Sequence, residues 1–316
     1  MVQETETDCY QKCSIRSPCE HHLQIIKSEL GENDERFRIT ENILFHWMDC
    51  QPHFPKNYDK SVVRNFLRGS KHNMDRAKQK LEYHFKAKSY FPEIFSRRQV
   101  SKDLIDTLNA VKMTPLPKLT KDGSRVFILK ISETDSDKID FNLIPKAYFM
   151  IYDVLLRNPN PAAKEVAVFD CEGTNAAHLM KLLGMLKTMI PLLRQAYAMR
   201  LKELHFINAH SGIEKCISIV KPILHPKVKN SIIFHQDSKS LLDHFGRNII
   251  PINYGGKAKY LNELTEDWIT ILKENEPWFK DQESAKICES VIMKPQKVSF
   301  KEHVGLEGSF RKLEID

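Results

Sequence analysis

The residues of this chain best placed for acid–base chemistry are Asp170, which ends the β-rich run VAVFD, and Glu172 just after it. A carboxylate at the end of a strand can act as a general acid or base when a partner base, nucleophile or metal lies nearby. No such partner stands near them in the sequence, and Gly173 follows at once. We therefore favour a structural role in which they hold a turn, and keep an enzyme acting at Asp170 and Glu172 as a remote alternative.

A cluster near the N-terminus is the second candidate for chemistry. It contains Cys9, Cys13 and Cys19, followed by His21 and His22, and these residue types bind zinc. Their spacing matches no closed zinc finger. The chain has seven cysteines, an odd number scattered along its length, which favours free thiols in a reducing compartment and leaves zinc as the minor alternative.

Motifs of other enzyme classes are missing from the sequence. No glycine-rich phosphate loop follows a strand-like run, and HExxH, GxSxG and CxxC do not occur. The sequence therefore predicts no catalytic residue, no cofactor and no metal.

The charge pattern points toward an anionic surface. The 316 residues carry 48 Lys and Arg against 41 Asp and Glu, a net charge of +7. Residues 56–102 alone hold thirteen basic residues against four acids, a local charge of +9. Such polarisation favours attraction to an anionic membrane, although solvated helix faces are the simpler explanation for most of these lysines. Base-stacking aromatics are not interleaved with them, so we expect no nucleic-acid partner.

Two regions must position any functional side chains. The first hundred residues show helical patterns at 22–30, from residue 33 onward, at 59–68 and at 74–89. In the second of these patterns, an apolar stripe of Ile39, Ile43, Leu44 and Trp47 is expected to face inward. Short apolar β-rich runs follow at 126–131, 166–170, 204–208 and 231–235, separated by helical patterns at 143–156, 178–194 and 212–224. A last amphipathic helix carries Leu261, Leu264, Trp268, Ile271 and Leu272. This order predicts the α/β class, with strands covered on both faces in a mixed, largely parallel sheet.

Export signals and membrane spans are not expected. The first ten residues are acidic and polar, unlike a secretory leader. The most apolar stretch, 179–199, is interrupted by Lys181, Lys187, Pro191 and Arg194, and eighteen uninterrupted apolar residues never occur. We expect a cytoplasmic protein with transient peripheral membrane association.

Several ordered segments resemble the CRAL-TRIO lipid-transfer family. They are FLRGSKHNMDRAKQKLEYHFKAKSYFPEIF (66–95), VFDCEG (168–173) with His178 after it, YAMRLKELHFINAH (197–210), IVKPIL (219–224) and IIPINYGGKA (249–258). The closing GLEGSFRKLEID (305–316) is similar to the endings of insect members related to alpha-tocopherol transfer protein and cellular retinaldehyde-binding protein. The resemblance covers residues 33–316.

The resemblance implies a carrier of a hydrophobic small molecule, such as a tocopherol, retinoid, carotenoid or related lipid, and not an enzyme. It implies a helical bundle followed by a lipid-binding domain whose apolar pocket is closed by a mobile gate helix, 212–224. The implied ligand-binding residues are Tyr148, Tyr152, Leu155, Ile213, Cys216, Ile217 and Val220. Sequestering a long hydrocarbon contributes roughly 0.8 kcal/mol per buried CH₂, so a dozen carbons give about 10 kcal/mol without any catalytic residue.

The resemblance also implies a basic cleft for phosphoinositide headgroups. Carried over by position, that cleft uses Arg68, Lys71, Arg200, Lys202, Lys227 and Lys229. Ser70 and Ser231 stand where relatives usually carry further basic residues. A phosphoinositide-responsive membrane adaptor without a transported ligand therefore remains the alternative function.

The expected domain organisation has four parts. Residues 1–32 form a flexible tail, 33–100 the helical N-terminal module, 101–260 the lipid-binding domain, and 261–316 a C-terminal helix with an extended tail.

Overall fold

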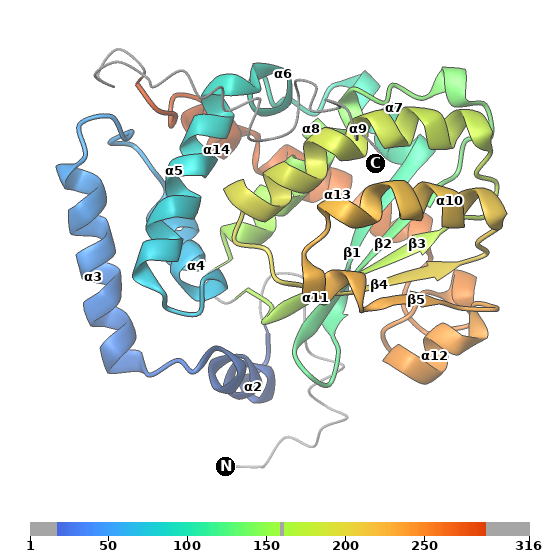
Figure 1. Cartoon of the computed structure of the whole chain (residues 1–316), viewed down its shortest axis with the longest axis horizontal. Coiled ribbons are helices and arrows are strands. Elements are labelled where there is room, and N and C mark those ends of the chain that lie inside the picture. The colour runs from blue at the N-terminus through green and yellow to red at the C-terminus, as the bar shows by residue number, and fades with distance from the viewer. Residues whose placement is uncertain (1–17, 159–160, 289–316) are drawn as a thin grey trace, which may run out of the picture.

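The structure is a computed structural model and describes residues 18–158 and 161–288. Its N-terminal part is helical, as the sequence predicts (Figure 1). The helices are α2 (Glu20–Leu30), α3 (Asp34–Cys50), α4 (Lys60–Gly69), α5 (Met74–Tyr90), α6 (Pro92–Phe95) and α7 (Lys102–Ala110). Asn33, Asp59, Asn73 and Ser101 cap four of them by accepting hydrogen bonds from backbone N–H groups of the first turn.

The stripe predicted for α3 is wrong in part. Ile39 and Ile43 are 56% and 51% exposed, whereas Phe37, Leu44 and Met48 are buried. The buried face includes Glu41, which forms an ion pair with Arg64 of α4. Because Glu41 is buried with its ion-pair partner, the buried face of α3 differs from the face that hydrophobicity alone indicates.

Helix α2 lies inside the segment expected to be a flexible tail. Its Ile26 and Leu30 are buried against Leu119 and Ala163 of the α/β region, so residues 20–30 are packed structure. Cys19, which precedes this helix, is disulfide-bonded, so the expectation of seven free thiols is wrong. Cys50, Cys171 and Cys216 are free. Cys9 and Cys13 lie outside the described residues.

A five-stranded sheet forms the centre of the second region, in the order β1-β2-β3-β4-β5. The strands are β1 (Val111–Leu119), β2 (Ser124–Ile131), β3 (Lys164–Asp170), β4 (Leu201–Ile207) and β5 (Ile232–Phe234). Strand β1 is antiparallel to β2 and the other pairs are parallel, which confirms the mixed, largely parallel sheet. The sequence did not predict β1, because it contains Pro115 and Pro117, which an edge strand tolerates.

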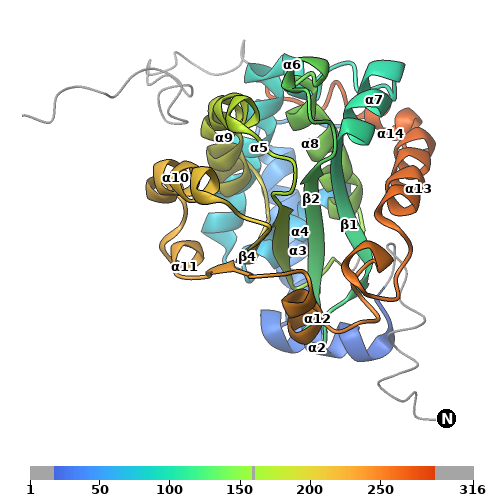
Figure 2. The ribbon, with the colours of Figure 1, turned by 90° about the vertical axis from the view of Figure 1, so that its right-hand side faces the viewer.

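Helices cover both faces of this sheet (Figure 2). One side carries α8 (Leu143–Leu156), α9 (Ala176–Ala196), α10 (Ser211–Val220) with the 3₁₀ turn η2 (Lys221–Ile223), and α11 (Pro226–Lys229). The other carries α12 (Lys239–Phe245), the 3₁₀ turn η3 (Ile252–Tyr254) and α13 (Leu261–Glu274), which α14 (Glu276–Asp281) follows. A short 3₁₀ turn, η1 (Ser136–Lys138), precedes α8.

Helix α9 is long and apolar enough to cross a membrane by length and composition alone. Its apolar residues have another explanation, because Leu182, Met185 and Met189 line an internal cavity together with Leu179 and Ile190. Composition alone therefore gives no reason to place α9 in a bilayer.

A buried ion pair joins the helical module to the α/β region. Arg98, between α6 and α7, pairs with Asp153 of α8, and both side chains are at most 3% exposed. Asp153 also accepts a hydrogen bond from the Tyr197 hydroxyl at 2.9 Å, and the Arg98 guanidinium lies 4.9 Å from the centre of the Phe279 ring. Four separate segments of the chain thus meet around this ion pair.

We predict that Asp153→Asn destabilises the protein strongly. The change leaves the buried Arg98 charge without its partner, which typically costs about 3–5 kcal/mol. Urea unfolding followed by circular dichroism measures the loss. Asp137→Asn is the matched control, since Asp137 pairs with Lys181 at the surface and its side chain is 88% exposed. Equal stability of the two variants would contradict the anchoring role of Asp153.

Candidate functional site

An apolar cavity of about 230 Å³ lies between the sheet and the helices α8, α9 and α10. Strands β2, β3 and β4 form one wall, with Phe127, Leu129, Phe169 and Phe206 among the lining side chains. On β2 the neighbouring Val126 and Ile128 point into the core on the other face. The continuous apolar runs of the sequence therefore serve two environments, a packed core and a cavity.

Helix α10 closes this cavity opposite the sheet. Its four predicted ligand-facing residues, Ile213, Cys216, Ile217 and Val220, are buried and line the cavity. The α-helix ends at Val220, before the predicted limit of 224, because Pro222 follows and the chain continues as the 3₁₀ turn η2. Burial raises the pKa of the Cys216 thiol, and it raises that of Cys171 to about 12, so both stay protonated.

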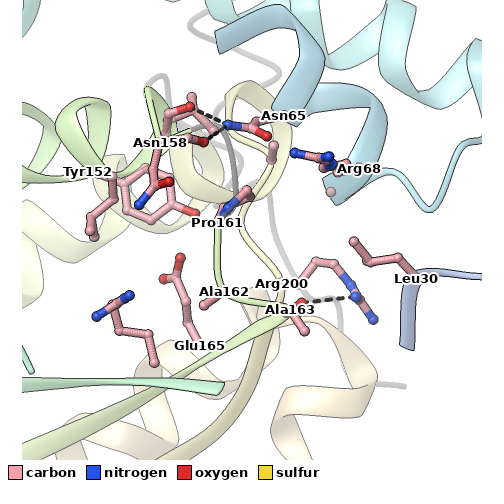
Figure 3. Close-up of a pocket in the computed structure, with 15 residues that line it drawn as sticks. Leu30, Asn65, Arg68, Tyr152, Asn158, Pro161, Ala162, Ala163, Glu165 and Arg200 are labelled. Atoms are coloured by element: carbon pink, nitrogen blue, oxygen red, sulfur yellow. Dashed lines mark hydrogen bonds between the residues drawn. The ribbon is translucent and has the colours of Figure 1, made fainter. Parts of the chain in front are cut away.

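The three predicted residues of α8 divide between two pockets. Tyr148 lines the cavity, whereas Tyr152 and Leu155 line a second pocket of about 40 Å³. That pocket lies between the end of α2, α4 and the chain around Asn158, and Arg68 and Arg200 flank it (Figure 3). Asn65 donates hydrogen bonds of 2.6 Å to the carbonyls of Leu156 and Asn158 at its edge.

Glu165 of β3 lines both pockets and was not predicted as a site residue. Burial raises its pKa to about 7, although a hydrogen bond from Tyr152 acts in the opposite direction. It is thus a polar group at one edge of a largely apolar cavity. Nothing in the sequence marks Glu165 as a site residue, because a charged pair such as Lys164-Glu165 is ordinary at the start of a strand.

Asp170 is engaged in structural contacts at another edge of the cavity. Its carboxylate accepts hydrogen bonds from Tyr254 (3.0 Å) and Asn208 (2.8 Å) and pairs with Lys130 at 2.8 Å. Although burial opposes ionisation, these contacts lower the pKa of Asp170. Glu172 also pairs with Lys130. This geometry favours the turn-holding role expected from the sequence over acid–base chemistry.

The six predicted headgroup-binding residues fall into three groups. In the first, Arg68 forms a two-pronged contact with Glu32, with nitrogen–oxygen distances of 2.9 and 3.0 Å. Lys71 and Arg200 instead contact Glu29 of α2 at 3.3 and 3.0 Å, as does Lys164 at 3.0 Å. Despite some desolvation, hydrogen bonds from these three cations lower the pKa of Glu29 to about 2. The basic cluster of Arg68, Lys71, Lys164 and Arg200 is therefore already paired with the protein's own carboxylates, Glu29 and Glu32.

The other two groups lie elsewhere. Lys202 is held between Asp122 at 3.2 Å and Glu203 at 3.1 Å. Lys227 and Lys229 lie on α11, directly after the gate, and within residues 18–158 and 161–288 no carboxylate comes within ion-pair distance of either. Of the six, only these two lysines present uncompensated charge.

Most of the cavity wall supplied by α9 escaped the sequence prediction. Leu182, Met185, Leu186, Met189 and Leu193 line the cavity, but their spacing resembles that of any core helix. The sequence signal that could have found them is the large number of long apolar residues in this helix, more than one packed face needs.

Comparison with known proteins finds two domain matches and several similar proteins. Residues 109–256 match the CRAL/TRIO domain, and residues 34–105 match the Pinta-like UBA domain. A Mus musculus protein named "Alpha-tocopherol transfer protein-like" is 26% identical over 277 residues, covering 85% of this chain and 79% of that protein. The Homo sapiens protein of the same name is 25% identical over 274 residues, covering 84% and 79%. The crystal structure of Sfh5 aligns with a TM-score of 0.46 at 13% identity, over 82% of this chain and 98% of that one.

The cavity, its sheet wall and the helix that closes it thus lie within the matched domain, which runs from β1 to η3. The resemblance seen in the sequence is confirmed: residues 109–256 of this chain match the CRAL/TRIO domain, and the curated relatives are named alpha-tocopherol transfer protein-like.

Proposed function

We propose that the protein is a carrier that binds one hydrophobic small molecule in the cavity beneath α10 and exchanges it at membranes. The observation that carries this proposal is the apolar lining, contributed by the sheet and by three helices, with α10 as its closure. Transfer of such a ligand from water is favourable by roughly 25 cal/mol per Å² of apolar surface buried. A membrane adaptor without a ligand gives no reason to keep such a cavity apolar, so we favour the carrier.

The size of the cavity supports a gate that moves. Small-molecule sites commonly measure about 300–1,000 Å³, and this cavity of about 230 Å³ falls just below that range. A tocopherol- or retinoid-sized ligand would require outward displacement of α10. We propose that residues 33–100 form the helical module and residues 101–260 the lipid-binding domain, with α10 as the moving element, while α2 packs against that domain and is not part of a flexible tail.

Membrane contact is the second part of the proposal. Ile219 on the outer side of α10 is 54% exposed, and the unpaired Lys227 and Lys229 follow on α11. An apolar side chain beside basic residues suits the interface of an anionic bilayer, where each cation contributes about 1 kcal/mol. We place the protein in the cytoplasm with transient peripheral association, and with phosphoinositide headgroups as the anionic partner.

We predict that Ile217→Asp abolishes binding of a hydrophobic ligand. The aspartate would place an unpaired charge against the ligand, at a cost of several kcal/mol. Extraction and mass spectrometry of the purified variant, with a fluorescent fatty-acid displacement titration, measure retained lipid and affinity. Ser218→Asp is the control, because the neighbouring Ser218 is exposed on the same helix. A folded Ile217→Asp protein that binds like the wild type would refute the assignment of α10 as the lid.

We predict that replacing Lys227 and Lys229 together by Glu slows ligand transfer to anionic vesicles and leaves affinity in solution nearly unchanged. Loss of two attractive charges and gain of two repulsive ones weakens vesicle encounter, and the difference fades as salt screens it. Transfer is measured to phosphoinositide-containing vesicles at low salt. Lys102→Glu with Lys273→Glu, on α7 and α13, gives the same change in net charge elsewhere. Equal rates for the two double variants would exclude a role for α11.

We predict that Glu29→Gln strengthens binding to phosphoinositide-containing vesicles. The change removes the carboxylate that contacts Lys71, Lys164 and Arg200, so those cations become available to a headgroup. Vesicle cosedimentation at low salt measures the effect. Asp34→Asn, which removes an exposed carboxylate paired with Lys27, changes the net charge equally. A similar gain for both variants would show a general charge effect and exclude the cluster as the headgroup site.

A further inference from the structure

A cluster of histidines lies on the face of the sheet opposite the cavity. Glu203 and His205 point to the same side of β4, because they are two residues apart on one strand. His244 of α12 completes the group, and the ligand atoms of all three residues lie within 4.8 Å of one another. We propose that Glu203, His205 and His244 form a binding site for Zn²⁺.

The separations fit tetrahedral zinc. Glu203 Oε2 lies 3.2 Å from His205 Nε2 and 3.3 Å from His244 Nε2. Zn–N and Zn–O bonds of about 2.0–2.2 Å at a tetrahedral angle place neighbouring ligand atoms about 3.3–3.5 Å apart. Two edges of the tetrahedron are therefore nearly present already. Two imidazoles and a carboxylate are a zinc ligand set that leaves a fourth position for water.

A chain of hydrogen bonds assigns the proton positions on His205. The Ser240 hydroxyl can donate to the Asp237 carbonyl at 2.7 Å, and in that arrangement its oxygen accepts from His235 Nδ1 at 2.8 Å. His235 Nε2 then carries a lone pair and accepts from His205 Nδ1 at 2.7 Å. His205 is left with its lone pair on Nε2. Metal-ligating histidines are commonly oriented in this way by an acceptor on the other ring nitrogen.

This assignment leaves two acceptors facing each other. In this arrangement the His205 Nε2 lone pair points toward the Glu203 carboxylate at 3.2 Å, and a cation between the two makes the contact favourable. A second proton on His205 would place a charge on a ring that is fully buried, which is costly. The other oxygen of Glu203, Oε1, is held by Lys202, so Oε2 is directed toward the rings. A bound Zn²⁺ satisfies all three groups.

The position of the site gives the ion a structural role. The segment that contains α10 and α11 leaves the sheet after β4 and returns through β5, just before His235 and α12. Glu203 and His205 lie before this excursion, and His244 lies after it. A bound ion would tie together the two ends of the segment that closes the cavity.

The test is titration of the full chain, after dialysis against a chelator, with Zn²⁺ alone and with Co²⁺ alone. We expect one Zn²⁺ per chain by calorimetry, a rise in Tm of several degrees at saturation, and no competition by Mg²⁺. The Co²⁺ complex should show d–d bands without thiolate charge transfer, which excludes the cysteines as ligands.

Variants complete the test. His244 is 37% exposed, so His244→Gln should fold, and it should weaken Zn²⁺ binding about 100-fold, as should Glu203→Gln. His46→Gln is the control, because His46 pairs with Cys50 on the distant helix α3 and its loss should leave binding unchanged. Absence of Zn²⁺ binding, thiolate charge transfer with Co²⁺, or binding unaffected by both His244→Gln and Glu203→Gln would each overturn the proposal.

Discussion

The structure depends on one constraint: the sheet presents apolar side chains on a face that the protein's own core does not fill. A cavity of about 230 Å³ left empty costs on the order of 5 kcal/mol at the rate measured for cavities in protein cores. That cost is a large part of the stability of an ordinary domain. A bound apolar ligand replaces the missing core, which explains why the surrounding elements are fixed by other means.

Those means are polar contacts from the helical module to the helix ends around the cavity. Lys80 of α5 donates to the carbonyls of Arg194 and Tyr197, and His84 donates to that of Ala196 at 3.1 Å. They satisfy carbonyls at the C-terminal end of α9, which the helix itself leaves unpaired. Burial lowers the pKa of Lys80 to about 8 and that of His84 to about 3. The module thus holds α9 at one end, and packing against α10 completes the wall.

The sequence predicted the elements better than their contacts. Helix α8 has the predicted limits 143–156, and the buried residues of α13 include the whole predicted stripe, because periodicity directly reports which face is apolar. The prediction from sequence failed where a residue far away in the chain determines whether a charged side chain is buried or paired. Glu41 is buried because Arg64 pairs with it, and Arg68 and Arg200 are neutralised by carboxylates 36 and 171 residues away. The cluster around His205 was equally invisible, since its members come from different elements.

The carboxylates on and after α2 determine how the basic cluster can respond to a membrane. With its pKa at about 2, Glu29 stays ionised at any cytoplasmic pH, so protonation does not release the cations. Their release requires displacement of α2, an 11-residue helix too short to be stable alone in water. It is held by the burial of Ile26 and Leu30 and by the contact between Glu32 and Arg68. A ligand with one negative charge gains no more from the cluster than Glu29 already provides. A headgroup with several phosphate charges gains more, so this arrangement favours polyanionic lipids over singly charged ones.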